Sequence, residues 1–161
     1  MYKKIHIGRY QFHWGVSKLQ WVDGTCSDLK NGKHILMWDF DEKSEEVATI
    51  ALLNVQHRFK LPKIYLMKSS EPDNWIAYCF KALDWQNAFG IVALTEAVDW
   101  QFVKHSSARN YFTLRIGKKR GQEPKLFTIL PSDVREDCKV DDLARFVKYQ
   151  TRADSKNAMG V

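Results

Sequence analysis

The sequence predicts an α+β fold built on a β-α-β-β-α-β core, and three features of the chain lead to this prediction. Residues 35–38 form a continuous apolar run, which is typical of a strand buried on both faces. Residues 42–59 and 85–95 carry apolar side chains at helical spacing. Short runs rich in β-branched and aromatic residues, separated by turn signals, flank both helices. This order of strands and helices indicates a sheet with helices packed against it.

The length and composition are those of a globular protein. The 161 residues are enough for one domain with a sizeable core, so we expect a single domain over residues 1–150 and a polar tail over residues 151–161. Six Trp and a hydrophobic fraction of 45% argue against general disorder. The net charge of +6 is compatible with a phosphate-bearing partner.

The sequence also indicates the compartment. Its three cysteines are far apart and odd in number, and no cysteine or histidine cluster has zinc-ligand spacing, so we expect a reducing, intracellular (cytoplasmic) setting. The N-terminal residues contain no long apolar run, so no signal peptide is expected. No segment approaches the ~20 apolar residues of a membrane span, so we expect no membrane partner.

The N-terminal half is predicted to supply the first strands and the first helix. Residues 4–14 alternate weakly and residues 18–22 form a second short run, which suggests a hairpin at one edge of the sheet. The helix over residues 42–59 has acidic residues in its first turns and basic residues in its last, which suits the helix dipole, and it should end before Pro62. Its expected apolar stripe comprises Val47, Ile50, Ala51, Leu52, Leu53 and Val55.

The C-terminal half is predicted to complete the core. Residues 63–68 and 75–80 are typical of a β-hairpin. Asp84 is placed to cap the helix over residues 85–95. The remaining expected elements, in order, are a strand over 97–103 that carries Asp99, a hairpin of 111–116 with 125–130, and a terminal helix over 141–150.

This order of elements is the split β-α-β arrangement of ferredoxin-like and RNA-recognition-motif folds. Parallel crossovers of this kind are right-handed, so both helices should cover one face of the sheet. The other face would then be open to a ligand. Extra N-terminal strands, and a C-terminal hairpin and helix, would extend this core.

Asp39 and Asp41 follow the buried strand directly and are the first candidate site residues. Side chains two residues apart on a strand point to the same face, so the two carboxylates would lie side by side and repel each other. A divalent cation removes this repulsion, and Mg²⁺ or Mn²⁺ prefers such oxygen ligands. The alternative is that Asp41 opens the next helix as its N-cap and Asp39 is solvated where the strand ends.

Two further polar positions would gather near this pair in the expected topology. Lys68, Ser69 and Ser70 end one strand, and Asp99 lies on another. Three carboxylates beside a cationic, hydroxyl-bearing loop suit metal-dependent phosphoryl transfer, because carboxylates hold the metal while lysine and hydroxyls bind phosphate oxygens. Taken singly, the loop would be a solvated hairpin and Asp99 an ordinary strand-edge acid. Their joint occurrence in this order favours a site.

A basic stretch with aromatic residues inside it follows Asp99. A strand could align several of its cations on one face. Such a ribbon suits a phosphate backbone, or a single strand whose bases stack on aromatic rings. The alternative is a solvated hairpin tip with Phe112 in the core. The candidate nucleic-acid-binding residues are Arg109, Tyr111, Lys118, Lys119 and Arg120.

Three short motifs therefore occur in a fixed order: Trp38-Asp39-Phe40-Asp41 after a buried strand, Met67-Lys68-Ser69-Ser70 at a strand end, and the hydrophobic-Asp pair Val98-Asp99. Residues 109–119 and the proline-bearing stretch 123–126 follow them. In this order the motifs resemble those of the archaeo-eukaryotic primase superfamily, the primase-polymerases common in plasmids and viruses. The resemblance covers residues 36–130, and the order of the motifs carries it more than any one of them.

The resemblance implies a minimal catalytic core with an RNA-recognition-motif-like sheet. It implies a metal-dependent nucleotidyltransferase, a DNA primase or polymerase, that uses Mg²⁺ or Mn²⁺ and nucleoside triphosphates on a DNA template. An RNA primer and a separate helicase would be its further partners in replication. Asp39, Asp41 and Asp99 would be catalytic and metal-binding, and the nucleotide-binding residues would be Lys68, Ser69, Ser70 and Arg115.

The sequence departs from the family at one position. The family's histidine, which helps to bind the phosphates of the incoming nucleotide, would fall within residues 74–79, where this chain has Ile76 or its neighbours. His105 is the nearest substitute, and the alternative for it is a solvated loop histidine. The missing histidine favours a second hypothesis, a noncatalytic nucleic-acid-binding module on the same fold. A haloacid-dehalogenase-like phosphohydrolase is disfavoured, because Lys43 stands where those enzymes usually have Thr or Val.

Overall fold

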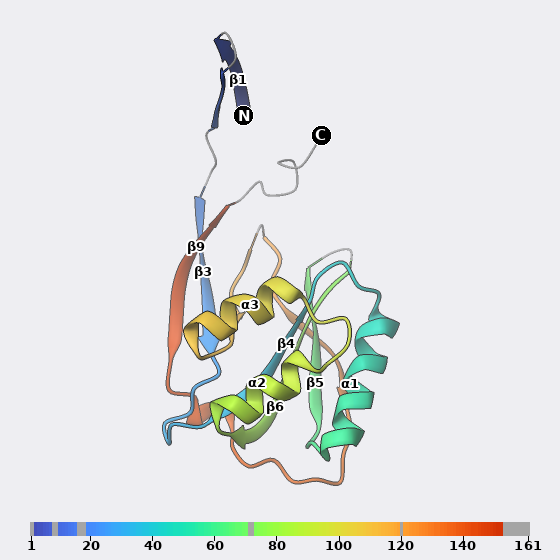
Figure 1. Ribbon diagram of the computed structural model, residues 1–161. Helices are drawn as coiled ribbons and strands as arrows, with labels where there is room; N and C mark the ends of the chain where they lie inside the picture. The colour runs from blue at the N-terminus through green and yellow to red at the C-terminus, as the bar shows by residue number, and fades with distance from the viewer. Residues whose placement is uncertain (1, 8–9, 16–18, 71–72, 120, 153–161) are drawn as a thin grey trace.

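The computed structural model describes residues 2–7, 10–15, 19–70, 73–119 and 121–152. These residues form a mixed α+β structure with two larger antiparallel sheets, a separate hairpin and three α-helices (Figure 1). No helix in the described ranges is long and apolar enough to cross a membrane. The elements are β1 (Tyr2–Ile7), β2 (Tyr10–Gly15), β3 (Leu19–Cys26), β4 (His34–Phe40), α1 (Glu45–Phe59), β5 (Ile64–Ser70), β6 (Asn74–Leu83), α2 (Trp85–Ala93), α3 (Trp100–Arg109), β7 (Thr113–Arg115), β8 (Lys125–Leu130), the 3₁₀ helix η1 (Val140–Asp142) and β9 (Phe146–Arg152).

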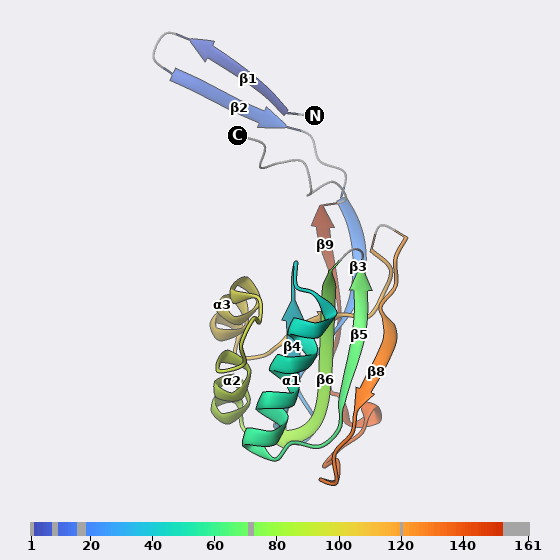
Figure 2. The ribbon, with the colours of Figure 1, turned by 90° about the vertical axis from the view of Figure 1, so that its right-hand side faces the viewer.

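The four-stranded sheet has the strand order β4-β6-β5-β8, and each neighbouring pair is antiparallel. Because β4 and β5 both pair with β6, which lies between them, β4 and β5 run parallel and α1 makes the crossover. The expected hairpin of the 63–68 and 75–80 segments is confirmed as β5 and β6. All three helices lie on one side of this sheet (Figure 2).

The strand β4 lies in the centre of the hydrophobic core. Ile35, Leu36, Met37 and Trp38 are all fully buried, which confirms the prediction of a strand covered on both faces. The indole N–H of Trp38 donates to the Thr95 hydroxyl at 2.9 Å, so this face of β4 is fastened to the end of α2. Asp39 follows Trp38 and therefore points to the opposite face of the sheet.

A serine caps the start of α1, and an aspartate caps the start of α2. Ser44 caps α1 by accepting the Val47 N–H at 3.3 Å, and Asp84 caps α2 as expected by accepting the Asn87 N–H at 3.0 Å. The expected apolar stripe of α1 was partly wrong. Small residues, with Leu52 and Val55, face the sheet because they allow close packing, whereas other apolar residues of the helix face solvent. The buried stripe is Ala48, Ala51, Leu52 and Val55, and the exposed ones are Val47, Ile50 and Leu53.

The C-terminal pairings differ from the expected ones. β7 does not form a hairpin with β8: β7 pairs with β3, and β8 pairs with the outer edge of β5. The terminal segment is not a helix but η1 followed by β9, which pairs with β3 over seven residues to complete the order β7-β3-β9. Both edges of β3 and the edge of β5 carry backbone groups that need partners, and these long-range pairings satisfy them.

The N-terminal strands also differ from expectation. The first hairpin forms within the first segment, between β1 and β2, and stands apart from the two larger sheets (Figures 1 and 2). β3 belongs to the three-stranded sheet instead of pairing with the first segment. The three cysteines, Cys26, Cys79 and Cys138, are free and buried.

Candidate metal centre

Three carboxylates from three separate places meet at the C-terminal end of β4. Asp39 is the penultimate residue of β4, Asp41 lies in the turn that follows, and Asp99 immediately precedes α3. One carboxylate oxygen of each lies within 4.8 Å of the others, which is close enough to bind a metal ion. The backbone N–H of Asp99 donates to the carbonyl oxygen of Asp39 at 2.8 Å, so the start of α3 is tied directly to the end of β4.

The prediction of a strand over residues 97–103 is wrong, because α3 begins at Trp100. Asp99 nevertheless lies beside Asp39 and Asp41, as predicted. Asp99 is the N-cap of α3, and its carboxylate accepts the N–H groups of Gln101 at 3.2 Å and Phe102 at 2.9 Å. Trp100 and Val103 are apolar at i, i+3, which is helical spacing, and the Asp99 cap starts the helix at this point. Asp99 thus orients α3 and faces the other two acids.

The alternative role of Asp41 as a helix cap is also wrong. Ser44 occupies that position, so Asp41 is not needed to start α1. The turn between them is held by other contacts: the Glu42 N–H donates to the Asn74 side chain at 3.2 Å, and the Lys43 N–H donates to the Asp73 carbonyl at 2.9 Å. Asp41 is therefore placed beside Asp39 by the turn, and its carboxylate remains exposed.

Two residues with left-handed backbone flank the acids. Glu42 has a φ of 57° and Ala97 a φ of 61°, and neither is glycine. A positive φ costs a residue with a Cβ about 1 kcal/mol or more, and such strain concentrates at functional sites. Here it lets the chain turn sharply after Asp41 and two residues before Asp99.

Burial and neighbouring acids destabilise the charged forms of Asp39 and Asp41. Burial, followed by the charges of Asp41 and Asp99, raises the pKa of Asp39 to about 8. Burial and then the charge of Asp99 raise the pKa of Asp41 above its usual value. Lys119 and Arg115 act in the opposite direction on both carboxyl groups. A divalent cation would relieve the same repulsion more strongly, because it carries two charges and binds the oxygens directly.

Arg115 is a buried cation held beside the acids. Its guanidinium donates to the carbonyl oxygens of Ser69 and Gln122, the latter at 2.9 Å. It is only 9% exposed, and burial lowers its pKa from the ordinary value while Tyr149 and Asp39 act against this shift. Arg115 therefore presents a fixed positive charge near the carboxylates.

Ile76 lies directly opposite Asp39. The two residues are Cα partners in the pairing of β4 with β6, and Ile76 is buried. Partners in an antiparallel pair point to the same face, so the Ile76 side chain lies on the Asp39 face of the sheet. This is the segment in which the resemblance places a histidine, and the chain has no hydrogen-bonding side chain at that point.

Tyr78 is on the same face, two residues further along β6. It is 8% exposed, and its hydroxyl has no hydrogen-bond partner among the residues that the structure describes. Asp39, Tyr149 and Arg115 are its electrostatic neighbours, and burial followed by the Asp39 charge raises its pKa well above the usual value. Tyr78 was not among the sequence-predicted site residues, because an apolar run does not distinguish a core tyrosine from one near a site.

A cavity of about 570 Å³ opens from the acids along α3. Asp39 and Asp99 lie in its wall, and so do His105 and Arg109, which are one helical turn apart on α3. His105 is thus a helix residue near the acids, not a loop residue. The opposite wall includes Tyr111 and Tyr149, from the segments around β7 and β9, and Tyr149 was missed because its segment was expected to be helical.

The strand end at Lys68 contributes to a separate cavity. Lys68 pairs with Trp75 across β5 and β6, and Trp75 pairs with Phe40, so Lys68 points to the face opposite Asp39. Its ammonium nitrogen lies 5.4 Å from the centre of the Trp75 ring. The expectation that Lys68 joins the carboxylates is therefore wrong, because one residue of register decides the face.

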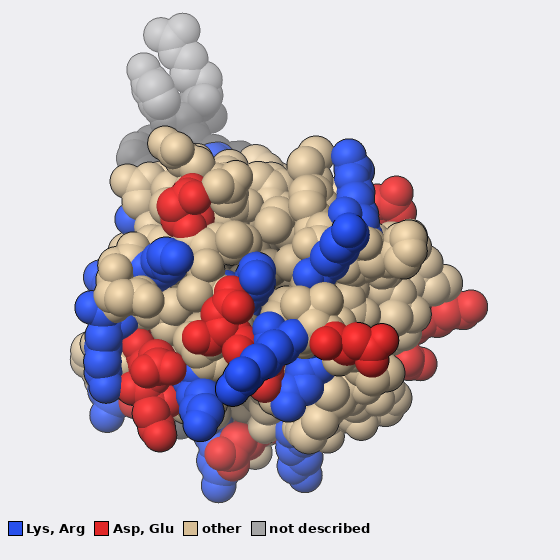
Figure 3. Space-filling view, turned by 90° about the horizontal axis from the view of Figure 1, so that it is seen from below, with Lys and Arg blue, Asp and Glu red and all other residues tan. Residues whose placement is uncertain are grey.

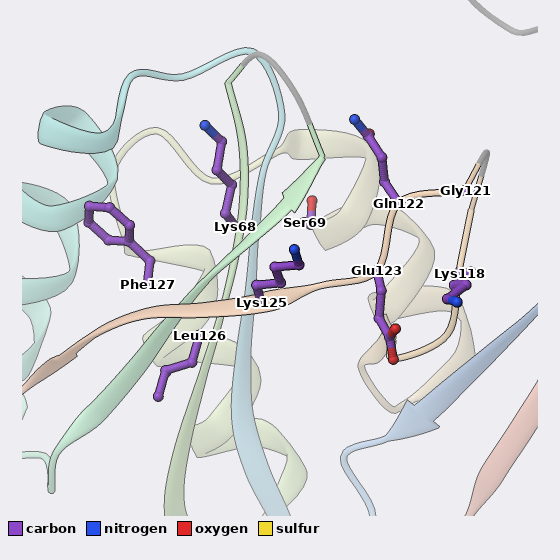
Figure 4. Close-up of a pocket in the computed structure, with 9 residues that line it drawn as sticks. All are labelled: Lys68, Ser69, Lys118, Gly121, Gln122, Glu123, Lys125, Leu126 and Phe127. Atoms are coloured by element: carbon purple, nitrogen blue, oxygen red, sulfur yellow. The ribbon is translucent and has the colours of Figure 1, made fainter.

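This second cavity, about 550 Å³, is lined by lysines from three segments. Lys68 comes from β5, Lys125 from β8 and Lys118 from the loop before β8 (Figure 4). Ser69 also lines it, but its hydroxyl donates to the Asn74 carbonyl at 3.2 Å within the hairpin. Lys125 was not among the sequence-predicted residues, because β8 was expected to pair elsewhere.

The predicted basic ribbon is divided among several places. Arg109 ends α3 beside the acid cavity, Lys118 lines the lysine cavity, and Lys119 acts electrostatically on the acids. The ring of Tyr111 is covered by the Arg145 guanidinium, whose central carbon lies 3.9 Å from the ring centre. Arg120 lies outside the described residues, and Ser70 ends β5 opposite Asn74.

The charge at the far end of the molecule is mixed. Figure 3 views the molecule from the end opposite the β1–β2 hairpin, where Lys and Arg are interspersed with Asp and Glu. The C-terminal end of β4, with the acids, points the other way (Figure 2).

Asp99 permits a test that separates its two roles. Serine caps a helix about as well as aspartate, so Asp99→Ser should change the melting temperature by less than about 2 °C, whereas Asp99→Ala should lower it by about 2–4 °C. Both variants should weaken Mn²⁺ binding at least about tenfold in calorimetry, since a carboxylate is lost. The matched controls are Asp84→Ser and Asp84→Ala at the α2 cap, which should repeat the thermal effects and leave Mn²⁺ binding unchanged. Unaltered Mn²⁺ binding in both Asp99 variants would contradict the site.

Comparisons of the chain with protein-family models, with curated proteins and with solved structures found no match. The fold and the acid cluster therefore define the site class on their own: an α+β domain with a three-carboxylate site that is able to bind a metal.

Proposed function

We propose that this protein is a metal-dependent nucleotidyltransferase of the primase-polymerase type, which acts on nucleoside triphosphates with a DNA template. The observation that carries the proposal is the convergence of Asp39, Asp41 and Asp99 within 4.8 Å at the end of a buried strand, with Arg115 held beside them. The parallel pair β4 and β5, with β6 between them and α1 as the crossover, supports an RNA-recognition-motif-like core around that site.

Asp39, Asp41 and Asp99 would hold Mg²⁺ or Mn²⁺, since all three offer the hard oxygen ligands that these ions prefer. The ion would neutralise phosphate charge and activate the attacking hydroxyl oxygen. Arg115 would bind a phosphate oxygen of the nucleotide from a fixed position, because two backbone carbonyls hold its guanidinium before any ligand arrives.

The cavity along α3 would then accept the substrate. Its acidic end lies at the candidate metal centre and its basic end at Arg109, eight residues after Gln101. On a helix this separation is about 12 Å, which is long enough for a ligand with several phosphates or for a short nucleic-acid segment. The lysine cavity, which is at the end of β5, would bind nucleic-acid phosphates outside the reaction centre.

A noncatalytic nucleic-acid-binding module is the second candidate, and Ile76 favours it. A buried alkyl side chain opposite Asp39 supplies no hydrogen bond to a phosphate, unlike a histidine at that point. Under this alternative the lysine cavity would be the main functional surface, and the acids would not take part in a reaction.

One set of measurements with the purified full chain separates the two candidates. Extension of a primed single-stranded DNA template is followed with Mg²⁺ or Mn²⁺ and all nucleoside triphosphates, and calorimetry follows Mn²⁺ and nucleotide binding. The nucleotidyltransferase requires metal-dependent incorporation. Salt-sensitive DNA binding that needs no metal, without incorporation and without Mn²⁺ binding, would instead support the binding module and contradict the proposed enzyme.

A further inference from the structure

The outer side of α1 is apolar, as is the side of this helix that packs on the sheet. Val47, Ile50 and Leu53 are 42%, 50% and 43% exposed, while Leu52 and Val55 are buried on the inner side. Figure 2 shows α1 in front of the sheet, where none of the described elements covers its outer side. A helix that is apolar on two sides is expected to be covered on both.

The other two helices do not share this feature. Their exposed positions are mostly polar, as in Gln86 of α2 and Lys104 of α3. Single exposed apolar residues are normal on a protein surface. Val47, Ile50 and Leu53, however, recur every third residue, so they form one continuous stripe on the helix, which we call the outer stripe.

The charges beside the outer stripe suit a second α1 that runs in the opposite direction. Glu46 is exposed and precedes Ile50 by four residues. His57 and Arg58 are exposed at the other end, and His57 follows Leu53 by four residues, a separation that places side chains on one side of a helix. In an antiparallel pairing centred near residue 52, Ile50 would face Leu53 of the second copy. Glu46 would face His57 and Arg58 of that copy, whereas a parallel pairing would bring the two Glu46 carboxylates together.

These charged side chains have unused capacity for such contacts. The helix dipole accounts for the sign of the charge at each end of α1, but it does not require the charges to lie beside an apolar stripe. Within the part of the chain that the structure describes, neither Glu46 nor His57 forms an ion pair. The guanidinium carbon of Arg58 lies 5.4 Å from the centre of the neighbouring Phe59 ring. A second copy would supply opposite charges at both ends of the stripe.

We propose that the outer side of α1 is the interface of a symmetric dimer, in which two α1 helices pack antiparallel around a two-fold axis. Each copy contributes the same surface, as an isologous interface requires. The outer stripe is an i±3 ridge, and such a ridge enters the i±4 groove of a facing helix at a crossing angle of about 20°. Contact through one helix buries less than a standard interface of about 1,600 Å², so we expect a dissociation constant of about 10–100 μM. The dimer goes beyond the proposed function and does not depend on the candidate metal centre.

Sedimentation equilibrium of the full chain, from about 1 μM to about 300 μM, measures this association. The wild type should pass from monomer toward dimer across the range. Ile50→Gln removes the central apolar side chain of the outer stripe and retains a good helix former, so it should raise the dissociation constant at least about tenfold. The matched control is Ile129→Gln, because Ile129 is 42% exposed but lies on the face of the sheet opposite the helices, paired with Tyr65. This control should leave the dissociation constant within about twofold of wild type.

Charge reversal tests the antiparallel direction separately from the apolar contact. Glu46→Arg and Arg58→Glu should each raise the dissociation constant about five- to tenfold, because each reversed charge meets a like charge of the second copy at two symmetric places. The double variant restores opposite charges across the two-fold axis and should dimerise within about twofold of wild type. Both reversals oppose the helix dipole, and the double variant retains that effect, so its recovery would not come from a more stable helix.

Three results would overturn the inference. The first is a wild type that stays monomeric up to about 300 μM, and the second is a dimer that Ile50→Gln leaves unchanged. The third is a double charge variant that associates as weakly as the single ones, since the antiparallel direction is part of the proposal. None of these measurements involves metal or nucleotide, so each of the two proposals is able to fail while the other stands.

Discussion

Asp39→Asn is expected to reduce metal-dependent nucleotide incorporation by about 10³-fold or more. The pKa of Asp39 is raised by burial and by the charges of both other acids, so this carboxylate gains most from a bound cation. Asparagine has the same shape but no charge, so it should leave the fold intact and remove the attraction for a divalent ion. Single-turnover extension of a primed template at saturating Mn²⁺ measures the loss, and calorimetry should show weaker Mn²⁺ binding in the same variant.

The control for this substitution is Asp84→Asn. Asp84 is a different aspartate, the N-cap of α2, and it lies outside the acid cluster. Asparagine is a good N-cap, so Asp84→Asn should retain both stability and incorporation. Incorporation by Asp39→Asn within tenfold of wild type, at equal folded fraction, would rule out Asp39 as a metal ligand.

The metal-free protein is expected to become less stable between pH 5 and pH 8, and Asp39 should cause a measurable part of this loss. The pKa of Asp39 is about 8 in the folded protein and about 4 in an unfolded chain. Between these values the folded protein holds a proton that the unfolded chain has released. The stabilisation is therefore fully present below about pH 4 and is lost as the pH rises to about 8.

The measurement is the free energy of unfolding in urea, with a chelator present, for wild type and Asp39→Asn. Between pH 5 and pH 8 the wild type should lose stability relative to Asp39→Asn by on the order of 2–4 kcal/mol. Burial lowers the pKa of His34, which makes stability rise with pH, so the difference between the two proteins is the quantity that reports on Asp39. Equal pH dependence of the two proteins would contradict the raised pKa.

Mn²⁺ provides the complementary result. Metal ligands must be deprotonated, so added Mn²⁺ should stabilise the wild type more at pH 8 than at pH 5. Asp39→Asn should show little stabilisation by Mn²⁺ at either pH. These two experiments together connect the repulsion among the acids with the binding of the ion that relieves it.

Some of the candidate site could be predicted from the sequence because its signals are local. The buried strand is marked by its unbroken apolar run, and Asp39 and Asp41 come directly after that run in the sequence. The turn after β4, and not strand periodicity, places Asp41 beside Asp39. The hairpin of β5 and β6 and the Asp84 cap of α2 also depend on residues close together in the chain. The predicted approach of Asp99 to the first two acids is confirmed, although the element that carries it is a helix.

Other parts of the site depend on strand register. Lys68 is one position away from the Asp39 face, and its placement follows from its pairing with Trp75. Ile76 and Tyr78 are on that face because β6 pairs with β4 in one register. A shift of the strand pairing by one residue would move each of these side chains to the opposite face of the sheet. A short apolar run contains no local pattern that specifies the register.

The sequence by itself determined the α+β class, the buried strand β4, two of the helices and the acidic pair at the end of that strand, because local periodicity and caps encode them. Only the tertiary structure decided that β8 adds to β5, that β9 adds to β3, and that backbone carbonyls of Ser69 and Gln122 hold Arg115. These choices depend on which distant strand edges and buried polar groups must find partners, and that requirement arises only once the chain is compact.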